Sequence, residues 1–101
     1  VDNPGYVRLT SGGCVNETPT WSPDGRTLYW VNNCDGDFEL VAADLAYDYD
    51  SQYGVSARLV NQRKLTDNSV DDRYARVSPN GRTVALSTQT NGVWDLAVLD
   101  V

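Results

Sequence analysis

Short runs rich in apolar, β-branched and aromatic residues alternate with turn-forming residues along this chain, and the pattern occurs twice. Residues 22–27 (SPDGRT) return as residues 78–83 (SPNGRT), an offset of 56 positions. The same offset, without a gap, aligns Leu-Thr at 9–10 with Leu-Thr at 65–66. Self-similarity at a fixed period is the signature of an architecture built from one repeated unit. The alignment defines repeat one as residues 1–45, an insertion as residues 46–56 and repeat two as residues 57–101.

Each repeat predicts four short strands joined by tight turns. The SPDG and SPNG segments combine a proline that presets φ with a glycine that accepts positive φ. Asp-Gly at 35–36 and Asn-Gly at 91–92 are hairpin dipeptides, and the runs between turns are rich in β-branched and aromatic residues. The expected strands are residues 5–9, 19–22, 27–31 and 38–44 in repeat one and residues 57–65, 75–78, 83–87 and 94–100 in repeat two.

The combined pattern resembles the TolB-type β-propeller repeat. In repeat one the resemblance is carried by Leu9, Thr10, Pro19, Trp21, Ser22, Pro23, Asp24, Gly25, Gly36 and Asp44, and in repeat two by Leu65, Thr66, Ser78, Pro79, Gly81, Gly92 and Asp100. Repeat two departs from the pattern at Ala75, Val77 and Asn80. The resemblance implies an all-β fold of two four-stranded antiparallel propeller blades. It also implies a bacterial, often extracytoplasmic, binding or scaffolding role without a catalytic signature.

Two blades do not close a propeller, which needs roughly 4–8. Three alternatives follow: a fragment of a longer propeller, a unit that self-assembles with copies of itself, or a compact body of two sheets. The resemblance also implies that the strand before each Leu-Thr is the outer strand of the preceding blade. The N-terminal strand of one chain could therefore complete the last blade of another by edge pairing.

The composition narrows the classes of partner. The formal net charge of −6 is spread along the chain, whereas nucleic acid and anionic membranes require a basic face. No apolar run approaches the roughly 20 residues that span a bilayer. The chain has no histidine, the commonest general base and metal ligand, so we expect no catalysis, cofactor or metal. Because the chain begins at Val1 rather than methionine, we expect a processed product or part of a longer polypeptide.

The two cysteines lie in loops that simple up-and-down strands place on the same face. We therefore predict a disulfide between Cys14 and Cys34, with two free thiols as the alternative. The bond would close a loop of about 20 residues and contribute about 3 kcal/mol. It would also indicate an oxidising compartment, such as the periplasm, the cell surface or the extracellular space.

The insertion is the most unusual segment and the candidate partner-binding site. It carries Tyr47, Asp48, Tyr49, Asp50 and Tyr53 in what the pattern predicts to be an exposed loop. Tyrosine supplies large, rigid contacts at recognition surfaces, so a protein or a glycan is the expected partner. A Ca²⁺ site at the two aspartates and a plain packing loop are the alternatives.

The remaining polar and aromatic residues have structural interpretations. Asp35 and Asp37 are expected in a polar hairpin turn, residues 71–73 in a solvated loop, and the three tryptophans (Trp21, Trp30 and Trp94) between blades, with a sugar platform as the alternative for one of them. The leading functional hypothesis is a non-enzymatic TolB-like module for protein binding or scaffolding. The alternatives are a structural surface protein that forms rings or fibres by strand exchange, and the propeller portion of a larger hydrolase or peptidase.

Overall fold

The computed structural model describes residues 7–50 and 54–101, and these residues form strands and connecting loops without any helix. The predicted all-β class is confirmed. The seven strands are β1 (Asn16–Trp21), β2 (Thr27–Asn32), β3 (Glu39–Asp50), β4 (Gly54–Lys64), β5 (Asp72–Val77), β6 (Thr83–Thr90) and β7 (Val93–Asp100).

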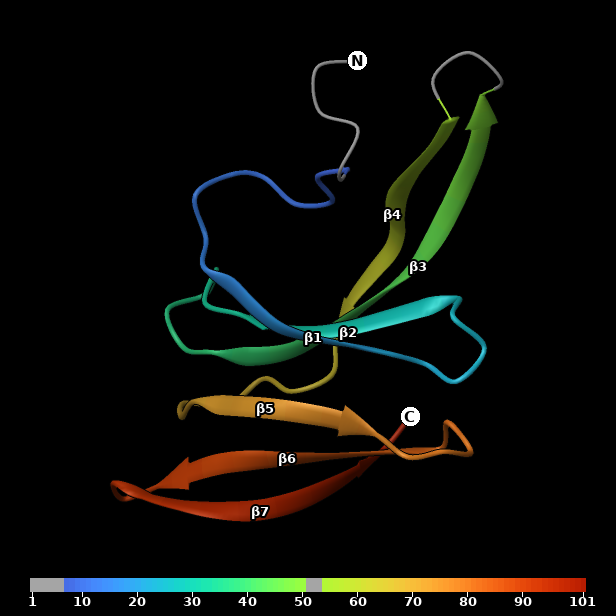
Figure 1. The fold of residues 1–101 in the computed structure, drawn as a ribbon. Coiled ribbons are helices and arrows are strands. Elements are labelled where there is room, and N and C mark those ends of the chain that lie inside the picture. The colour runs from blue at the N-terminus through green and yellow to red at the C-terminus, as the bar shows by residue number, and fades with distance from the viewer. Residues whose placement is uncertain (1–6, 51–53) are drawn as a thin grey trace.

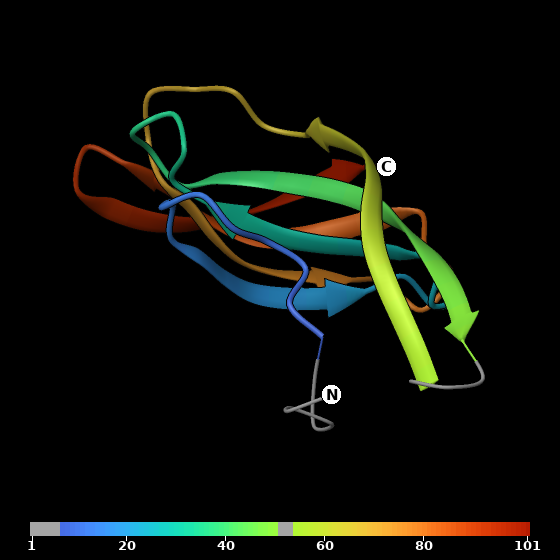
Figure 2. The ribbon, with the colours of Figure 1, turned by 90° about the horizontal axis from the view of Figure 1, so that it is seen from above.

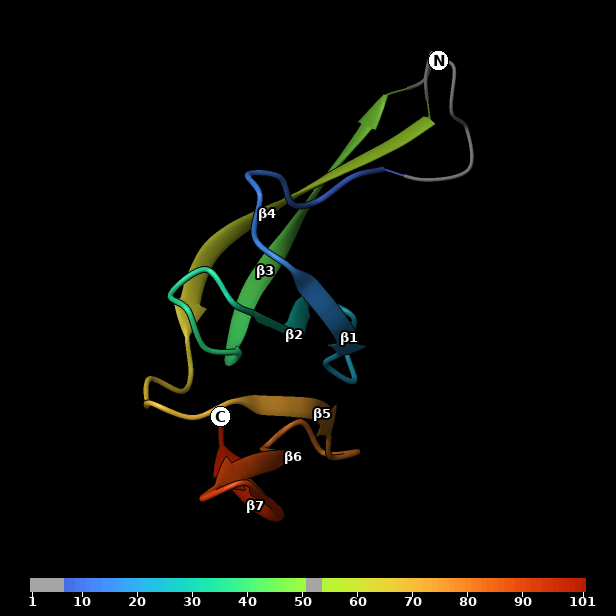
Figure 3. The ribbon, with the colours of Figure 1, turned by 90° about the vertical axis from the view of Figure 1, so that its left-hand side faces the viewer.

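The strands form two antiparallel sheets (Figure 1). Sheet A has the order β1-β2-β3-β4, and sheet B has the order β5-β6-β7. The sheets lie one above the other, with β5 next to sheet A in the views of Figures 1 and 3. Two four-stranded sheets were predicted, and this is wrong for the second, which has three strands. The reason is that the strand before Leu65-Thr66 pairs with β3 of sheet A, and no described strand takes the corresponding place beside β7.

The two Ser-Pro turns have the same internal hydrogen bonds. In the first turn, Asp24 Oδ1 accepts from Ser22 Oγ at 2.6 Å and from the backbone N–H of Arg26 at 3.0 Å. In the second, Asn80 Oδ1 accepts from Ser78 Oγ at 2.7 Å and from the backbone N–H two positions on at 3.0 Å. The repeated sequence therefore folds into repeated local structure, and aspartate and asparagine are interchangeable in this role.

The same two turns are neighbours in space. Gly81 has a φ of +75°, and a Cβ added there would lie 3.2 Å from Pro23 Cδ. The glycine is required both by the left-handed backbone of the turn and by the close approach of the first turn. Equivalent parts of the two repeats thus lie next to each other across the boundary between the sheets.

Two hydrophobic clusters form the core, one on each face of sheet A. Cluster 1 lies between the sheets, where it joins one face of sheet A to the inner face of sheet B. Cluster 2 lies on the far face of sheet A, where Leu9, Leu45 and Leu59 pack against it. Cluster 1 contains Tyr29, Val31, Leu40, Ala42, Ala75, Val84 and Leu86, and cluster 2 contains Leu28, Trp30, Val41 and Ala43.

The insertion is not an exposed loop, and this correction changes the shape of the molecule. Strands β3 and β4 extend into it from both sides and pair antiparallel, with Tyr47 opposite Ala57 and Tyr49 opposite Val55, while residues 51–53 lie outside the described residues. This hairpin projects beyond the rest of the molecule (Figures 1 and 2). Tyrosine and valine favour strands, and that preference decided the local structure over the turn-like aspartates.

The N-terminal strand expected at residues 5–9 is absent from the described residues. Positions 7–9 carry no strand pairing, and positions 5 and 6 lie outside the described residues. Leu9 instead packs on cluster 2 of sheet A. Strand β4 does form beside β3, so the two segments that precede a Leu-Thr pair differ in structure.

Candidate functional site

The outer face of sheet B, defined as Ala85, Ser87, Trp94, Leu96 and Val98, is an apolar surface that no described residue covers. Ala85 pairs with Val98 across the sheet, and Ser87 pairs with Leu96, which places these side chains on one face. Leu96 is 88% exposed and Val98 is 71% exposed. Adjacent apolar side chains with this exposure mark an interaction surface more often than isolated ones do.

The equivalent face of sheet A is fully covered. At the offset of 56 positions the outer face aligns with residues of cluster 1 and with Phe38, which packs against that cluster. Leu40, which is equivalent to Leu96, is 0% exposed, and Ala42, which is equivalent to Val98, is also 0% exposed. Sheet B itself covers the face of sheet A. The outer face of sheet B is therefore equivalent to this face of sheet A, but no sheet of the described residues covers it.

Strand β7 also has a free edge. The outer edge of β3 pairs with β4 over the length of both strands, whereas no strand among the described residues pairs with the outer edge of β7. A free edge presents unpaired backbone N–H and C=O groups to another strand. The free edge of β7 and the outer face are contiguous, since Trp94, Leu96 and Val98 belong to β7.

A polar joint ties the Leu65-Thr66 segment to β3 beside cluster 1. The backbone N–H of Leu65 donates to the carbonyl of Leu40 at 2.8 Å. Thr66 Oγ1 accepts from the backbone N–H of Leu40 at 2.9 Å and donates to Glu39 Oε1 at 3.3 Å. Glu39 Oε2 accepts from the backbone N–H of Asn68 at 2.6 Å. The Leu-Thr pair of repeat two thus docks on the third strand of the preceding sheet.

Burial raises the pKa of Glu39 above its ordinary value, and the nearby carboxyl of Asp72 raises the pKa further. Both carboxyl groups belong to buried residues. The Asp72 carboxylate accepts from the Asn68 side-chain amide at 2.9 Å. A buried carboxyl pair is costly unless hydrogen bonds satisfy it, and here the donors are Thr66 and Asn68.

Residues 71–73 form part of the same boundary, so their predicted place in a solvated loop is wrong. The Arg73 guanidinium lies 4.0 Å from the centre of the Phe38 ring. Arg73 Nη1 also donates to Glu17 Oε1 of β1 at 3.0 Å. Asp71 Oδ1 accepts from the backbone N–H of Phe38 at 2.9 Å. These contacts join sheet B to sheet A across the edge of cluster 1.

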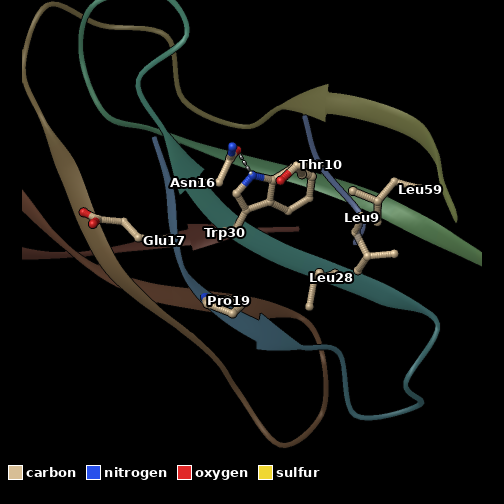
Figure 4. Close-up of a pocket in the computed structure, with 8 residues that line it drawn as sticks. All are labelled: Leu9, Thr10, Asn16, Glu17, Pro19, Leu28, Trp30 and Leu59. Carbon is tan, nitrogen blue, oxygen red and sulfur yellow. Dashed lines mark hydrogen bonds between the residues drawn. The ribbon is translucent and has the colours of Figure 1, made fainter. Parts of the chain in front are cut away.

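A hollow of about 160 Å³ opens on the far face of sheet A, away from sheet B (Figure 4). Trp30 forms its centre, and the Trp30 indole N–H donates to Asn16 Oδ1 at 2.9 Å. Leu9 and Thr10 border it from the N-terminal segment. Its lining residues are Leu9, Thr10, Asn16, Glu17, Pro19, Leu28, Trp30 and Leu59. The hollow is predominantly apolar and opens onto a sheet face.

The predicted disulfide is present. Cys14 and Cys34 are bonded, with their Cα atoms 5.0 Å apart. The bond connects the N-terminal segment to the loop between β2 and β3. It therefore helps to hold Leu9 and Thr10 against sheet A.

The structure brings only part of the predicted tyrosine site into view. Tyr47 is exposed in β3, where it also interacts with other residues. The side chains of Asp48, Tyr49 and Asp50, and the whole of Tyr53, lie outside the described part of the chain. Their role in recognition stays a prediction.

The tryptophans were expected between blades, and the structure corrects this. Trp30 is buried, but in cluster 2 on the face turned away from sheet B. Trp21 and Trp94 are exposed. Asp35 lies in the loop between β2 and β3 as predicted and forms an ion pair with Lys64.

The polar joint was not predicted, although the sequence contained a signal for it. Glu39 precedes Leu40 as Asp95 precedes Leu96, and the two Leu-Thr pairs align at the same offset. A carboxylate at the same place in both repeats indicates a repeated acceptor. Its burial could not be inferred from this pattern, because Asp95 is exposed.

Within the described ranges, no group of three or more His, Cys, Asp or Glu side chains is placed to hold a metal ion. Nor do these ranges contain a helix with the length and apolar character to cross a bilayer. No protein-family model matches the sequence, and no curated protein matches it either.

Proposed function

We propose that this chain is a non-enzymatic TolB-like β-propeller module for protein binding or scaffolding, with sheets A and B as its blades. The outer face of sheet B carries the proposal. The equivalent surface of sheet A is buried by a sheet, so the outer face has the shape and composition that a further sheet would cover. A flat apolar face beside a free strand edge suits protein recognition by sheet packing and strand addition.

The site is unlike those that enclose small ligands. Small-molecule sites are concave and bury most of the ligand, whereas the outer face follows the surface of one sheet. The Cys14–Cys34 bond is consistent with an extracytoplasmic location, since disulfides persist in oxidising compartments.

An extended chain tests the proposal directly. A second copy of residues 46–101 is appended after Val101, which aligns with Leu45, so that the register of the repeat is preserved. The copied β4 should pair with β7, and the copied sheet B should cover the outer face. We expect slower amide exchange at Leu96 and a blue-shifted emission of Trp94 relative to the original chain.

The control is the same extended chain with Leu96→Asp, which should reverse both changes because a buried charge opposes packing. If the appended segment leaves the exchange of Leu96 unchanged, the outer face does not accept a sheet and the proposed function fails.

A further inference from the structure

We propose that the outer face of sheet B binds the hollow of sheet A on a second copy of this chain, so that copies join head to tail as sheets A and B join within one chain. This inference rests on the proposed function and names the partner of that same surface. The contact between sheets A and B within one chain identifies the partner of the outer face. Each interaction in that contact has an equivalent in the proposed contact between two copies.

The hollow is equivalent to the side of sheet B that packs on sheet A. At the offset of 56 positions, the aligned pairs are Leu9 with Leu65, Pro19 with Ala75, Leu28 with Val84 and Trp30 with Leu86. The second member of each pair belongs to cluster 1 or packs against it. The first member of each pair lines the hollow. The hollow thus resembles in composition the inner face of sheet B, which sheet A covers.

The outer face of sheet B is equivalent to the face of sheet A that packs against sheet B. Leu40 and Ala42 pack against sheet B within the chain, and their equivalents Leu96 and Val98 are exposed. Applied to two copies, the same packing places Leu96 of one copy at the hollow of the other. One chain therefore carries both halves of the interface.

The polar joint has its counterpart as well. Within the chain, Thr66 bonds to Leu40 and Glu39. The equivalent contact would join Thr10 of one copy to Leu96 and Asp95 of the next. Among the described residues, Leu9 and Thr10 have no hydrogen-bond partner of their own. Their donors and acceptors are therefore available for this contact.

The charges at the boundary are complementary in both contacts. Glu17 and Arg73 occupy equivalent positions in the two repeats, and they form an ion pair where sheet B follows sheet A. Where sheet A of a second copy follows sheet B, Arg73 meets Glu17 again. A contact between two different surfaces of the same chain is heterologous, so it propagates into a ring if it closes and into a filament if it does not.

Sedimentation velocity over a concentration series tests the inference on the chain as it exists. Three variants define the surfaces: Leu96→Asp blocks the outer face, Thr10→Asp blocks the hollow by facing Asp95, and Val93→Asp is the control on the same strand. Leu96, Thr10 and Val93 all lack full burial, and circular dichroism checks that each variant folds. Val98→Asp repeats the first test if Leu96→Asp does not fold.

We expect the unmodified chain and Val93→Asp to associate as concentration rises to about 100 µM, and Leu96→Asp and Thr10→Asp to associate at least about tenfold more weakly. Mixing the two weakened variants should yield a one-to-one dimer. In that dimer the intact outer face of Thr10→Asp binds the intact hollow of Leu96→Asp, and each chain blocks further growth.

Three results would overturn the inference: a monomer throughout the series, association that survives Leu96→Asp, or association that survives Thr10→Asp, which would mean that the outer face pairs with something other than the hollow. Failure of the mixed dimer would overturn it too. The extended chain distinguishes a failure of the proposed function from a failure of the second-copy inference. If residues 46–101 in the same chain cover Leu96 but separate copies do not associate, only the second-copy inference fails.

Discussion

Sheets A and B are built from the same repeated sequence, yet sheet A carries a hydrophobic cluster on both faces and sheet B on only one. Cluster 1 and cluster 2 lie on the two faces of sheet A. Sheet B contributes its inner face to cluster 1 and exposes Leu96 and Val98 on the other. The edge strands differ in the same way. Strand β4 pairs with the outer edge of β3, whereas no strand within residues 7–50 and 54–101 pairs with the outer edge of β7.

This difference shows that a position in a repeat does not determine its energetic role. Leucine stands at both position 40 and position 96, but burial alone decides how much each contributes to folding. The outer face of sheet B has apolar Leu96 and Val98 at the positions of the buried Leu40 and Ala42. Four measurements can break or sharpen the comparison.

The largest difference is expected between Leu40→Ala and Leu96→Ala. Removing the buried leucine leaves a cavity and should lower the free energy of unfolding by about 3 kcal/mol. The exposed leucine should cost less than about 0.5 kcal/mol. Chemical denaturation of dilute monomer measures both. Equal losses in the monomer would mean that Leu96 is covered in solution and that the two sheets are alike.

The disulfide gives sheet A a second advantage. Replacing both cysteines (Cys14→Ser with Cys34→Ser) should lower the free energy of unfolding by about 3 kcal/mol. The reason is that the bond joins residues 20 positions apart and so restricts the conformations of the unfolded chain. Val70 and Thr90 hold the equivalent places in repeat two, so sheet B has no such bond. Hydrogen exchange should accelerate most at Val15 and Asn33, because the backbone N–H of Val15 donates to Asn33 Oδ1 and the backbone N–H of Asn33 donates to the Val15 carbonyl, next to the disulfide. Unchanged exchange there would show that the disulfide is not needed to hold this segment.

The two turn glycines form a matched pair. Gly25 and Gly81 have φ of +73° and +75°, but only Gly81 lies close to another residue, Pro23. Gly81→Ala should therefore cost more than Gly25→Ala, which carries the backbone strain of about 1–2 kcal/mol alone. Thermal unfolding of both variants gives the comparison. A larger loss at Gly25 would contradict the stacking of the two turns.

The smallest effect concerns pH and the acidic residue before each equivalent leucine. The pKa of Glu39 is raised above 4.5 by burial, so the folded state binds this proton more tightly than the unfolded state does. The stability that Glu39 contributes is complete below pH 4.5 and is lost as the pH rises through the pKa of the folded state. Glu39→Gln should remove this decline.

Asp95→Asn is the control for that measurement, because Asp95 occupies the equivalent place and is exposed. The free energy of unfolding of the three proteins is followed by denaturation from about pH 4 to pH 7. A decline that persists in Glu39→Gln would locate its origin in another group.

The local elements of this fold could be predicted from the sequence because their causes are local. The Ser-Pro turns and the Asp-Gly turn depend on neighbouring residues, as do strands β2 and β6 through their apolar and β-branched residues, and these elements formed as expected. The disulfide followed from the order of strands. The insertion was wrongly interpreted because aspartates between tyrosines resemble a loop, whereas the strand preference of tyrosine and valine prevailed and Tyr47 pairs with Ala57 across the insertion.

The candidate site could not be predicted in the same way, because it depends on which face of each strand is covered. Leu96 has the same position in the repeat as Leu40, and only the three-dimensional packing shows that one is buried and the other exposed. The position of Arg73 was missed for a similar reason. Its charged neighbours indicate a solvated loop, but its partners Glu17 and Phe38 are distant in the sequence.

The ion pair between Glu17 and Arg73 bears on whether an array built from this chain contains an even or an odd number of sheets. Each copy contributes one sheet with an acidic side chain at this place and one with a basic side chain. Along an array the signs alternate, so every junction is attractive only when the number of sheets is even. In a closed ring with an odd number, two like charges would meet at one junction, and duplication of the unit within a single polypeptide excludes that arrangement.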